Sequence, residues 1–360
     1  MRKLALTALA LALTAGCASQ TTTTTATATA TEVSGRLLET GSTLLYPLMN
    51  LWVASYQKQH ADVQITTQGT GSGTGISQAI AGVAQIGASD AYMSDAQMKG
   101  TPMLNIPLAI SAQQINYNVP GLNGVHLRLS GPVLAGIYSG KILTWNDPAI
   151  VGINPRYASK LPHHTIVPIH RSDGSGDTFI FSQYLSYSTP SWAQGPGMGT
   201  TISWPAVASG VGANGNPGMV ETCKNTPYSI AYIGVSFLDQ TQAAHLGYAA
   251  LRNRAGAFVL PAHATIAAAA QAMVNKTPKD ERISLVFAPG KQSYPIINYE
   301  YAIVNPHQTG AAARANLVAF LSWAILPNGG NASRFLDEVH FLPLPPSIVK
   351  LSKEQIAKIH

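Results

Sequence analysis

The stretch T-I-V-P-I-H-R-S-D-G-S-G-D-T-F, residues 165–179, combines residue types that suit the binding of an anion. Its β-branched, apolar start favours a strand, and the letters F-I-F-S-Q-Y-L from Phe179 onward fit a helix. A Gly-rich turn between the two would point backbone N–H groups and the positive end of the helix dipole at one place. Arg171 offers a planar guanidinium that suits a tetrahedral oxyanion, and Ser175 can cap the helix or donate its hydroxyl.

The same stretch also fits an ordinary strand–helix connection in which Ser175 only caps the helix and Arg171 faces water. Other segments therefore have to decide between the two readings. The letters V-Q-I-T-T-Q-G-T-G-S-G-T-G-I-S-Q-A-I repeat the layout of strand, Gly-Ser turn and helix, with Ser72 in the turn. The short strand I-G-A-S-D ends on a hydroxyl and on the carboxylate of Asp90.

A third hydroxyl-bearing helix start is predicted near the beginning of the globular part. Gly41, Ser42 and Thr43 precede a segment in which apolar residues recur at helical spacing as far as Tyr56. Because Pro47 is tolerated only in the first turn of a helix, we expect this helix to begin at Ser42–Thr43.

The order of the remaining segments predicts an α/β fold. Strand-like and helix-like patterns alternate, and residues 190–227, which are rich in Gly and Pro, are expected to form surface loops. Two extended apolar runs, one beyond Asn105 and one at Pro295–Val304, have the length of crossings between domains. We therefore expect two α/β domains joined by a two-strand hinge, with a ligand cleft between them.

The N-terminus has the layout of an export signal. Arg2 and Lys3 precede a short apolar run and then T-A-G-C, which ends at Cys17. We expect residues 1–17 to be a lipoprotein signal peptide in which Cys17 becomes acylated; ordinary signal cleavage with an incidental cysteine is the alternative. Residues 18–36 are rich in Thr and Ala and are predicted to be a flexible tether. Lipidation of Cys17 would leave Cys223 as an unpaired thiol, without a disulfide framework.

The composition limits the possible functions. The chain has 360 residues, of which 46% are hydrophobic and 11% charged, so it can form two domains with sizeable cores. The formal net charge is +6, but no dense block of Lys and Arg occurs, which argues against nucleic acid as a partner.

The sequence gives little support to an enzyme. Neither Ser72 nor Ser175 lies in G-x-S-x-G, because Thr70 and Asp173 stand at the first glycine position, and no Gly-Lys-Ser/Thr of a Walker A motif occurs. The adjacent histidines at 163 and 164 would point to opposite faces of a strand, so neither a metal nor a cofactor is expected. A secreted phosphatase that acts on phosphomonoesters is the alternative to a protein that only binds an anion.

Taken together, G-S-T-L-L-Y-P, Q-G-T-G-S-G-T-G, G-A-S-D, W-N-D-P and H-R-S-D-G-S-G-D-T-F resemble the phosphate-binding receptors of the PstS type. These serve ABC importers and have the two-lobed type II periplasmic-binding-protein fold. The resemblance runs from about Leu37 to the tail and looks closest to the mycobacterial-type lipoproteins. It implies a discontinuous domain I, residues 37–113 and 299–360, and a domain II, residues 114–298.

The resemblance also implies which residues touch phosphate. Asp173 would orient Arg171 without touching the ligand, and Asp177 stands where many relatives have Thr. The implied phosphate-binding residues are Thr43, Leu44 through its backbone N–H, Ser72, Asp90, Arg171, Ser175, Gly176 and Asp177.

The predicted function is therefore the capture of inorganic phosphate outside the cytoplasmic membrane, without turnover. Asp90 would accept a hydrogen bond from the protonated phosphate and would meet sulfate, which carries no proton, with an unsatisfied negative charge. Closure of the two lobes would present the loaded receptor to the permease subunits of an ABC importer. We expect a monomer anchored by lipid to a membrane that faces the periplasm or the cell exterior. A receptor of the same fold for sulfate or molybdate is the remaining alternative.

Overall fold

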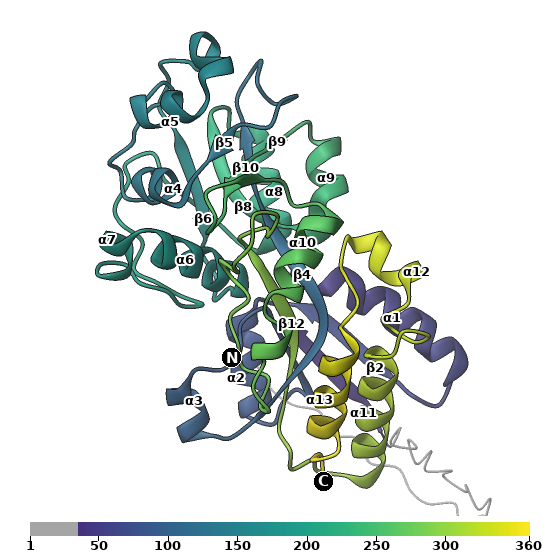
Figure 1. Cartoon of the computed structure of the whole chain (residues 1–360). Helices are drawn as coiled ribbons and strands as arrows, with labels where there is room; N and C mark the ends of the chain where they lie inside the picture. Colours follow the sequence, from purple (N-terminus) through teal and green to yellow (C-terminus); the bar gives the residue numbers. More distant parts are fainter. Residues whose placement is uncertain (1–34) are drawn as a thin grey trace, which may run out of the picture. The chain divides into compact units, whose positions relative to one another are not determined.

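The computed structural model describes residues 35–360, in which strands and helices alternate along most of the chain (Figure 1). The strands are β1 (Leu37–Gly41), β2 (Ile65–Gly69), β3 (Ile86–Ser89), β4 (Leu104–Asn118), β5 (Arg128–Leu129), β6 (Val167–Arg171), β7 (Val211–Ala213), β8 (Ser229–Gly234), β9 (Gly247–Tyr248), β10 (Ala250–Arg252), β11 (Phe258–Val259) and β12 (Ile297–Val304).

The helices fill most of the connections between these strands. The α-helices are α1 (Tyr46–Gln59), α2 (Ser72–Ile80), α3 (Asp95–Gly100), α4 (Gly131–Tyr138), α5 (Pro148–Ile153), α6 (Gly176–Ser188), α7 (Pro190–Ala193), α8 (Gly215–Asn225), α9 (Leu238–Ala243), α10 (His263–Gln271), α11 (Ala311–Ala324), α12 (Ser333–Leu336) and α13 (Pro346–Ile356). The 3₁₀ helices are η1 (Pro155–Lys160), η2 (Val235–Phe237), η3 (Val274–Lys276) and η4 (Asp337–Val339).

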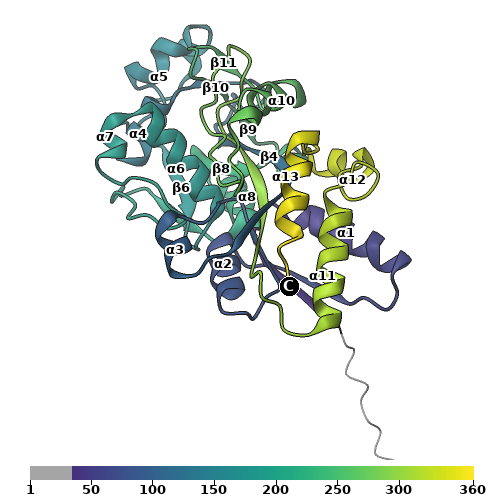
Figure 2. The ribbon, with the colours of Figure 1, turned by 60° about the horizontal axis from the view of Figure 1, so that its bottom comes forward.

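The main sheet has the strand order β2-β1-β3-β12-β4-β8-β6-β7, with β9 also paired to β4. The long strand β4 changes partner along its length: it pairs with β12 as far as Ala112 and with β8 from Gln113 onward. One strand thus belongs to both halves of the sheet. In the first half, α11 and α13 pack side by side, in contact with β1 and β4 respectively (Figures 1 and 2).

Parallel strands in each half of the sheet bring their carboxyl ends to a common edge. Strands β1, β2 and β3 run parallel in the first half, and β6, β7 and β8 run parallel in the second. Ligands of open α/β sheets bind beyond the carboxyl ends of such strands. Every loop that the sequence marks for anion binding follows one of these ends: residues 42–45 after β1, 70–71 after β2, Asp90 after β3 and 172–175 after β6.

Two expectations from the sequence were wrong. Helix α1 begins at Tyr46, and Ser42 instead closes a preceding turn by accepting the backbone N–H groups of Leu44 and Leu45 on its hydroxyl. Residues 190–227 are not all loop, because α7, β7 and α8 lie within them. The Gly and Pro residues of this segment obscured a helix whose start, Gly215, requires a positive φ of 64°.

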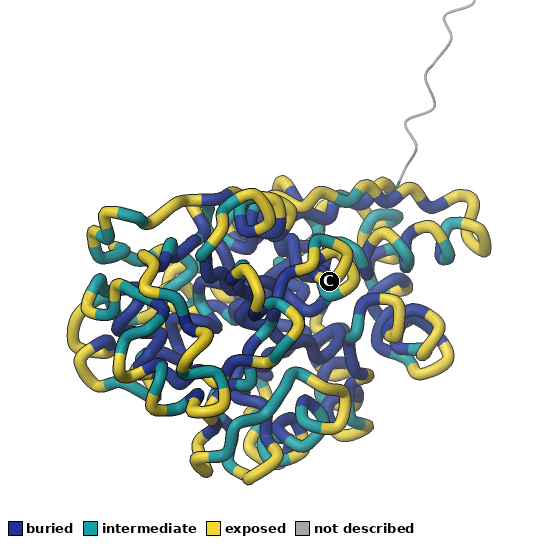
Figure 3. The backbone as a smooth tube through the Cα atoms, turned by 90° about the horizontal axis from the view of Figure 1, so that it is seen from above, coloured by how far each residue is buried: buried dark blue, intermediate teal, exposed yellow. Residues whose placement is uncertain are grey.

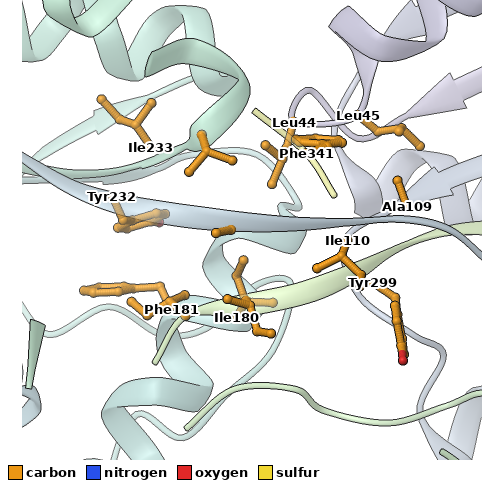
Figure 4. Close-up of a cluster of buried hydrophobic side chains, with 14 of the residues drawn as sticks. Leu44, Leu45, Ala109, Ile110, Ile180, Phe181, Tyr232, Ile233, Tyr299 and Phe341 are labelled. Carbon is orange, nitrogen blue, oxygen red and sulfur yellow. The ribbon is translucent and has the colours of Figure 1, made fainter. Parts of the chain in front are cut away.

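The core surrounds β4 and β12, which are buried almost throughout their lengths. Buried backbone, dark blue in Figure 3, gathers in the middle of the molecule. Alternate residues of β4 serve its two faces, so that Ala109 and Ile110 point to opposite sides (Figure 4). Phe341 packs on the side of Ala109, and Tyr299 lies on the other side (Figure 4). Both faces of this strand are thus covered, which explains why its sequence reads as a nearly continuous apolar run.

Glu39 in β1 carries a fully buried carboxyl group. Burial raises its pKa to about 8 from an ordinary value of 4.5. Between these two values the folded protein keeps a proton that the unfolded chain has lost, so stability falls as the pH rises. At pH 7 this effect of Glu39 lowers the free energy of unfolding by about 3 kcal/mol relative to acidic pH. We expect Glu39→Gln to abolish this contribution.

Chemical unfolding of both proteins at several pH values would measure this difference. Glu338→Gln, a change at an exposed glutamate, is the control and should leave the pH dependence intact. Equal slopes of the free energy of unfolding against pH in Glu39→Gln and the wild type would contradict the expectation.

The remaining findings concern the ends of the chain and its cysteines. Within residues 35–360 no helix has the length and apolar character that crossing a membrane requires. Cys223 is buried and free, and burial raises the pKa of its thiol to about 12. The predicted signal peptide, Cys17 and nearly all of the predicted tether lie outside the described residues.

Candidate functional site

The carboxyl group of Asp90 lies at the end of β3, where hydroxyl groups from the loop after β1 and from the start of α2 reach it. Ser42 donates to Oδ1, and Ser72 donates to Oδ2 at 3.2 Å. Asp90 is 2% exposed. Its pKa is raised well above the ordinary value, first by burial and then by the neighbouring Glu300, whereas Ser42 and Arg171 act in the opposite direction.

The first turns of α2 and α6 converge beside Asp90. A Cβ atom on Gly176, the first residue of α6, would lie 2.4 Å from Asp90 Oδ2 and 2.6 Å from the hydroxyl oxygen of Ser72, the first residue of α2. The two Gly-rich loops are also joined directly, because the N–H of Gly73 donates to the carbonyl of Gly174 at 2.8 Å. Two helix N-termini from the two halves of the sheet thus meet at one carboxyl group, and only glycine fits between them.

Ser175 caps α6, as its position in the sequence predicts. Its hydroxyl accepts the N–H of Thr178 at 3.3 Å, and its own N–H donates to the carbonyl of Thr200 at 2.8 Å. The unpaired N–H groups of a helix's first turn and the positive end of its dipole favour negative charge at such a position.

Arg171 supplies the positive side chain of the site and is 3% exposed. Its guanidinium forms a two-pronged contact with Asp173, in which Nε donates to Oδ1 at 2.6 Å and Nη2 donates to Oδ2. Its Nη1 donates to Asp177 Oδ2 at 2.7 Å. The backbone N–H of Arg171 donates to the hydroxyl oxygen of Tyr232 at 2.8 Å, which fixes the end of β6. The guanidinium is therefore held in one orientation by two carboxylates.

Asp177 is buried and takes part in a network that reaches across the sheet. Asn216 Nδ2 lies 2.7 Å from Asp177 Oδ2 and 3.0 Å from Thr43 Oγ1, and Gln113 Nε2 donates to Asp177 Oδ1 at 3.1 Å. Burial raises the pKa of Asp177 to about 7, the charge of Asp90 adds to the rise, and Arg171 opposes it. Asp177 therefore changes its charge close to neutral pH.

The structure brings the predicted residues together in two groups. Ser72, Asp90 and Gly176 are neighbours, and Arg171 forms ion pairs with Asp173 and Asp177. The charges of the two groups act on each other, since Arg171 lowers the pKa of Asp90 and Asp90 raises that of Asp177.

Thr43 and Leu44 are linked to these groups through the side chains of Asn216 and Ser42. Thr43 is linked to Asp177 only through Asn216. The backbone N–H of Leu44 donates to the hydroxyl oxygen of Ser42 at 3.1 Å, and its side chain fills the space above Gly234.

The histidines take no part in this site. His170 is stacked on Trp204 with ring centroids 4.9 Å apart, away from the guanidinium of its neighbour Arg171, and His163 contacts Asn146 at an exposed position. Among residues 35–360 no group of three or more His, Cys, Asp or Glu residues is arranged to hold a metal ion.

Four residues of the site were not identified from the sequence. Ser42, Gln113, Asn216 and Glu300 are all fully buried and contact or act on the predicted acids. Gln113 and Glu300 each interrupt an apolar strand, and a polar residue in such a run is itself a signal, because burying it requires a partner. Asn216 lies in the segment that was wrongly predicted to be loop.

Comparison with known sequences places this arrangement in a family. Residues 21–328 match the sequence profile of a PBP superfamily domain. The chain is 34% identical to the phosphate-binding protein PstS of Methanocaldococcus jannaschii over 337 residues, which cover 89% of this chain and 85% of that protein. It is also 34% identical to the phosphate-binding protein PstS of Xylella fastidiosa over 317 residues, 88% of this chain and 84% of the other.

A solved structure shares the fold. A high-affinity periplasmic phosphate-binding protein, PfluDING, bound with phosphate at pH 8.5, superposes with a TM-score of 0.68 and 23% sequence identity. The match covers 89% of this chain and 93% of that one. The two-lobed α/β architecture expected from the sequence is therefore confirmed.

Proposed function

This chain belongs to the PBP superfamily and, within it, to the phosphate-binding proteins of the PstS type, and from this premise we propose that the site around Asp90 and Arg171 holds inorganic phosphate. The protein is an exported substrate-binding protein of phosphate import and not an enzyme. The observation that carries the proposal for the site is the meeting of two helix N-termini at the buried carboxyl group of Asp90, with the buried guanidinium of Arg171 lowering the pKa of that carboxyl group.

In the proposed binding mode each residue has a distinct task. Arg171, held by Asp173, pairs with the charge of the anion, and the first-turn N–H groups of α2 and α6 donate to its oxygens together with the hydroxyls of Ser72 and Ser175. Thr43 and the backbone N–H of Leu44 complete the shell from the first half of the sheet. For this last contact the N–H of Leu44 has to exchange Ser42 for the ligand.

Asp90 is proposed to select phosphate. Inorganic phosphate keeps at least one proton near neutral pH and can share it with this carboxyl, whereas sulfate has no proton to share. A buried acceptor without a donor costs about 1–3 kcal/mol, and more when it is charged, so the penalty falls on sulfate alone. Sulfate and molybdate are the alternative ligands whose affinities have to be compared with that of phosphate.

We also propose the domain boundaries and the anchoring expected from the sequence. Domain I would comprise residues 37–113 and 299–360 and domain II residues 114–298, which fits the exchange of partners along β4. The permease subunits of an ABC importer are the partners, and a monomer anchored through lipid on Cys17 would meet them at the membrane.

Calorimetric titration of the purified mature chain, stripped of bound anions, tests the proposed function. We expect phosphate to bind much more tightly than sulfate or molybdate and no phosphate to be released from a monoester. If sulfate or molybdate bound more tightly than phosphate, the protein would be a receptor of the same fold for a different oxyanion. Release of phosphate from a monoester would favour the alternative of a phosphatase.

Asp177 should make phosphate binding depend on pH. With a pKa raised to about 7, it is neutral below this value and can donate to the ligand; above it, the ionised carboxylate repels the anion and competes for Arg171. We expect the phosphate affinity of the wild type to fall as the pH rises through 7. Asp177→Thr keeps only a hydroxyl, which does not titrate here. The factor by which the affinity falls per pH unit should therefore be smaller in this variant than in the wild type, by up to about tenfold.

The measurement is a series of phosphate titrations across neutral pH with both proteins. Ser172→Thr, a change at an exposed residue of the same loop, is the control. An affinity profile of Asp177→Thr that runs parallel to that of the wild type would show that Asp177 does not titrate against the ligand.

A further inference from the structure

Glu300 is a buried carboxyl group directly beside the proposed selectivity residue. Strands β12 and β3 are antiparallel with Tyr301 opposite Ser89, so that Glu300 lies opposite the next position, Asp90. The register of β12 against β4 also shifts at this point, with Glu300 opposite Ala109 and Tyr301 opposite Pro107. Such irregularities redirect side chains, and they are frequent next to functional sites.

A hydrogen-bond network holds Glu300 in place. Ser111 Oγ and Asn298 Nδ2 both reach Glu300 Oε1, the latter at 3.0 Å. Asn298 Nδ2 also lies 3.3 Å from the backbone carbonyl of Asp90. Asn298 therefore links Glu300 to Asp90, and Ser111 holds Glu300 from one more direction.

The contacts of the two carboxyl groups indicate where a proton resides. Three of their four oxygens accept hydrogen bonds from Ser42, Ser72, Ser111 or Asn298. The fourth, Glu300 Oε2, is buried and has no N–H or O–H donor within residues 35–360. Two carboxyl groups can form a hydrogen bond with each other only when one of them is protonated, and the oxygen without a donor is the natural place for that proton.

We propose, on the premise of the proposed function, that Glu300 is a positioning residue that keeps one proton and donates it to Asp90, so that Asp90 presents an acceptor to phosphate. The proton on Glu300 stays on the protein, and the ligand supplies the second proton that Asp90 accepts. Sulfate could be accommodated only by drawing the proton away from Glu300, which would leave a buried, ionised carboxylate behind.

The charges around the pair agree with a retained proton. Burial raises the pKa of Glu300, and the charge of Asp177 on α6 adds to the rise, whereas the hydrogen bonds with Asp90, Ser111 and Asn298 lower it. Arg171 on β6 is the cation that acts on Asp90 and lowers its pKa. Ser42, Ser72, Ser111 and Asn298 face the pair as uncharged donors. The guanidinium of Arg171 forms its ion pairs with Asp173 and Asp177, so it forms none with the pair of Asp90 and Glu300.

The test compares the pH dependence of phosphate binding in the wild type and Glu300→Gln. The amide of glutamine imitates a protonated carboxyl group at every pH. At alkaline pH the wild type should lose affinity as Glu300 ionises, and binding should take up a proton. In Glu300→Gln the slope of log Kd against pH, and the proton uptake seen by calorimetry in two buffers, should each be lower by about one.

Glu281→Gln is the matched control. Glu281 is another buried glutamate, with a pKa raised to about 8 by burial, but its carboxyl group contacts Ser352 on α13. Its replacement should leave the slope and the proton uptake of phosphate binding unchanged. Equal slopes in the wild type and Glu300→Gln would overturn the proposal while leaving phosphate binding established, whereas a wild type that binds no phosphate would overturn the proposed function itself.

Ser111→Ala provides a second test should Glu300→Gln not fold. It removes a hydroxyl that stabilises the ionised form of Glu300 and should therefore shift the alkaline loss of affinity to higher pH. A general weakening of the site would lower the affinity at every pH without this shift, and that result would contradict the proposal.

Discussion

Arg171→Ala is expected to weaken phosphate binding by about 30-fold to about 3,000-fold, the range for removal of one partner from a buried, hydrogen-bonded charge pair. Arg171 is 3% exposed, and its guanidinium is the cation that acts on Asp90 and Asp177. Without it, an incoming anion meets three carboxyl groups, those of Asp90, Asp173 and Asp177, and no positive side chain to offset them. Calorimetric titration with phosphate measures the loss.

Two variants separate the loss of the ligand contact from a general effect. Arg171→Lys keeps the positive charge but loses the planar guanidinium that forms two hydrogen bonds with Asp173. We therefore expect an affinity for phosphate between those of the wild type and Arg171→Ala. Arg282→Ala also removes an arginine bound to two acids, Asp95 and Asp280, and it should change the affinity for phosphate only a few-fold, or about 1 kcal/mol. A correctly folded Arg171→Ala that binds phosphate as tightly as the wild type would contradict the role of this residue.

The alternation of strands and helices was readable from the sequence because local patterns determine it. Gly-rich turns, β-branched runs and the spacing of apolar residues located β6, α2 and α6 and the hydroxyls at the helix starts. The start of α1 was missed by three residues. The hydroxyl of Ser42 accepts the N–H groups of a turn that precedes the helix, and helix propensities do not reveal such a turn. Asn216 was missed because a helix rich in Gly and polar residues has no apolar periodicity to reveal it.

The site itself was only partly predictable, because its assembly depends on contacts between distant segments. The sequence identifies Asp90 as an acid at a strand end and Arg171 as a base before a Gly-rich turn. It contains nothing local that pairs Asp177 with Asn216, which is 39 positions away, or places Glu300 beside Asp90. Such pairings follow from strand register, and register is set by the packing of the whole sheet. A charged residue in an apolar strand shows that a partner must exist but not which residue it is.

The second large effect is expected for selectivity. Asp90→Asn should reduce the preference for phosphate over sulfate by about 5-fold to about 150-fold, the equivalent of removing one unsatisfied buried acceptor from the sulfate complex. The amide of asparagine can donate to an oxygen of either anion, and its carbonyl can still accept the phosphate proton. Ser42 and Ser72 donate to different oxygens of Asp90, so in Asp90→Asn one hydroxyl keeps its acceptor and the other turns to accept from the amide NH2 group.

Asp173→Asn is the appropriate comparison for Asp90→Asn, because it neutralises another acid of the same site that binds Arg171 rather than the ligand. It should alter the affinities for phosphate and sulfate in the same direction and by similar factors, and so preserve their ratio. Parallel titrations of both variants with both anions distinguish the cases. If Asp90→Asn rejected sulfate as strongly as the wild type, the discrimination would have to come from another group, and Asp177, which shares the buried site and titrates near neutrality, would be the next residue to change.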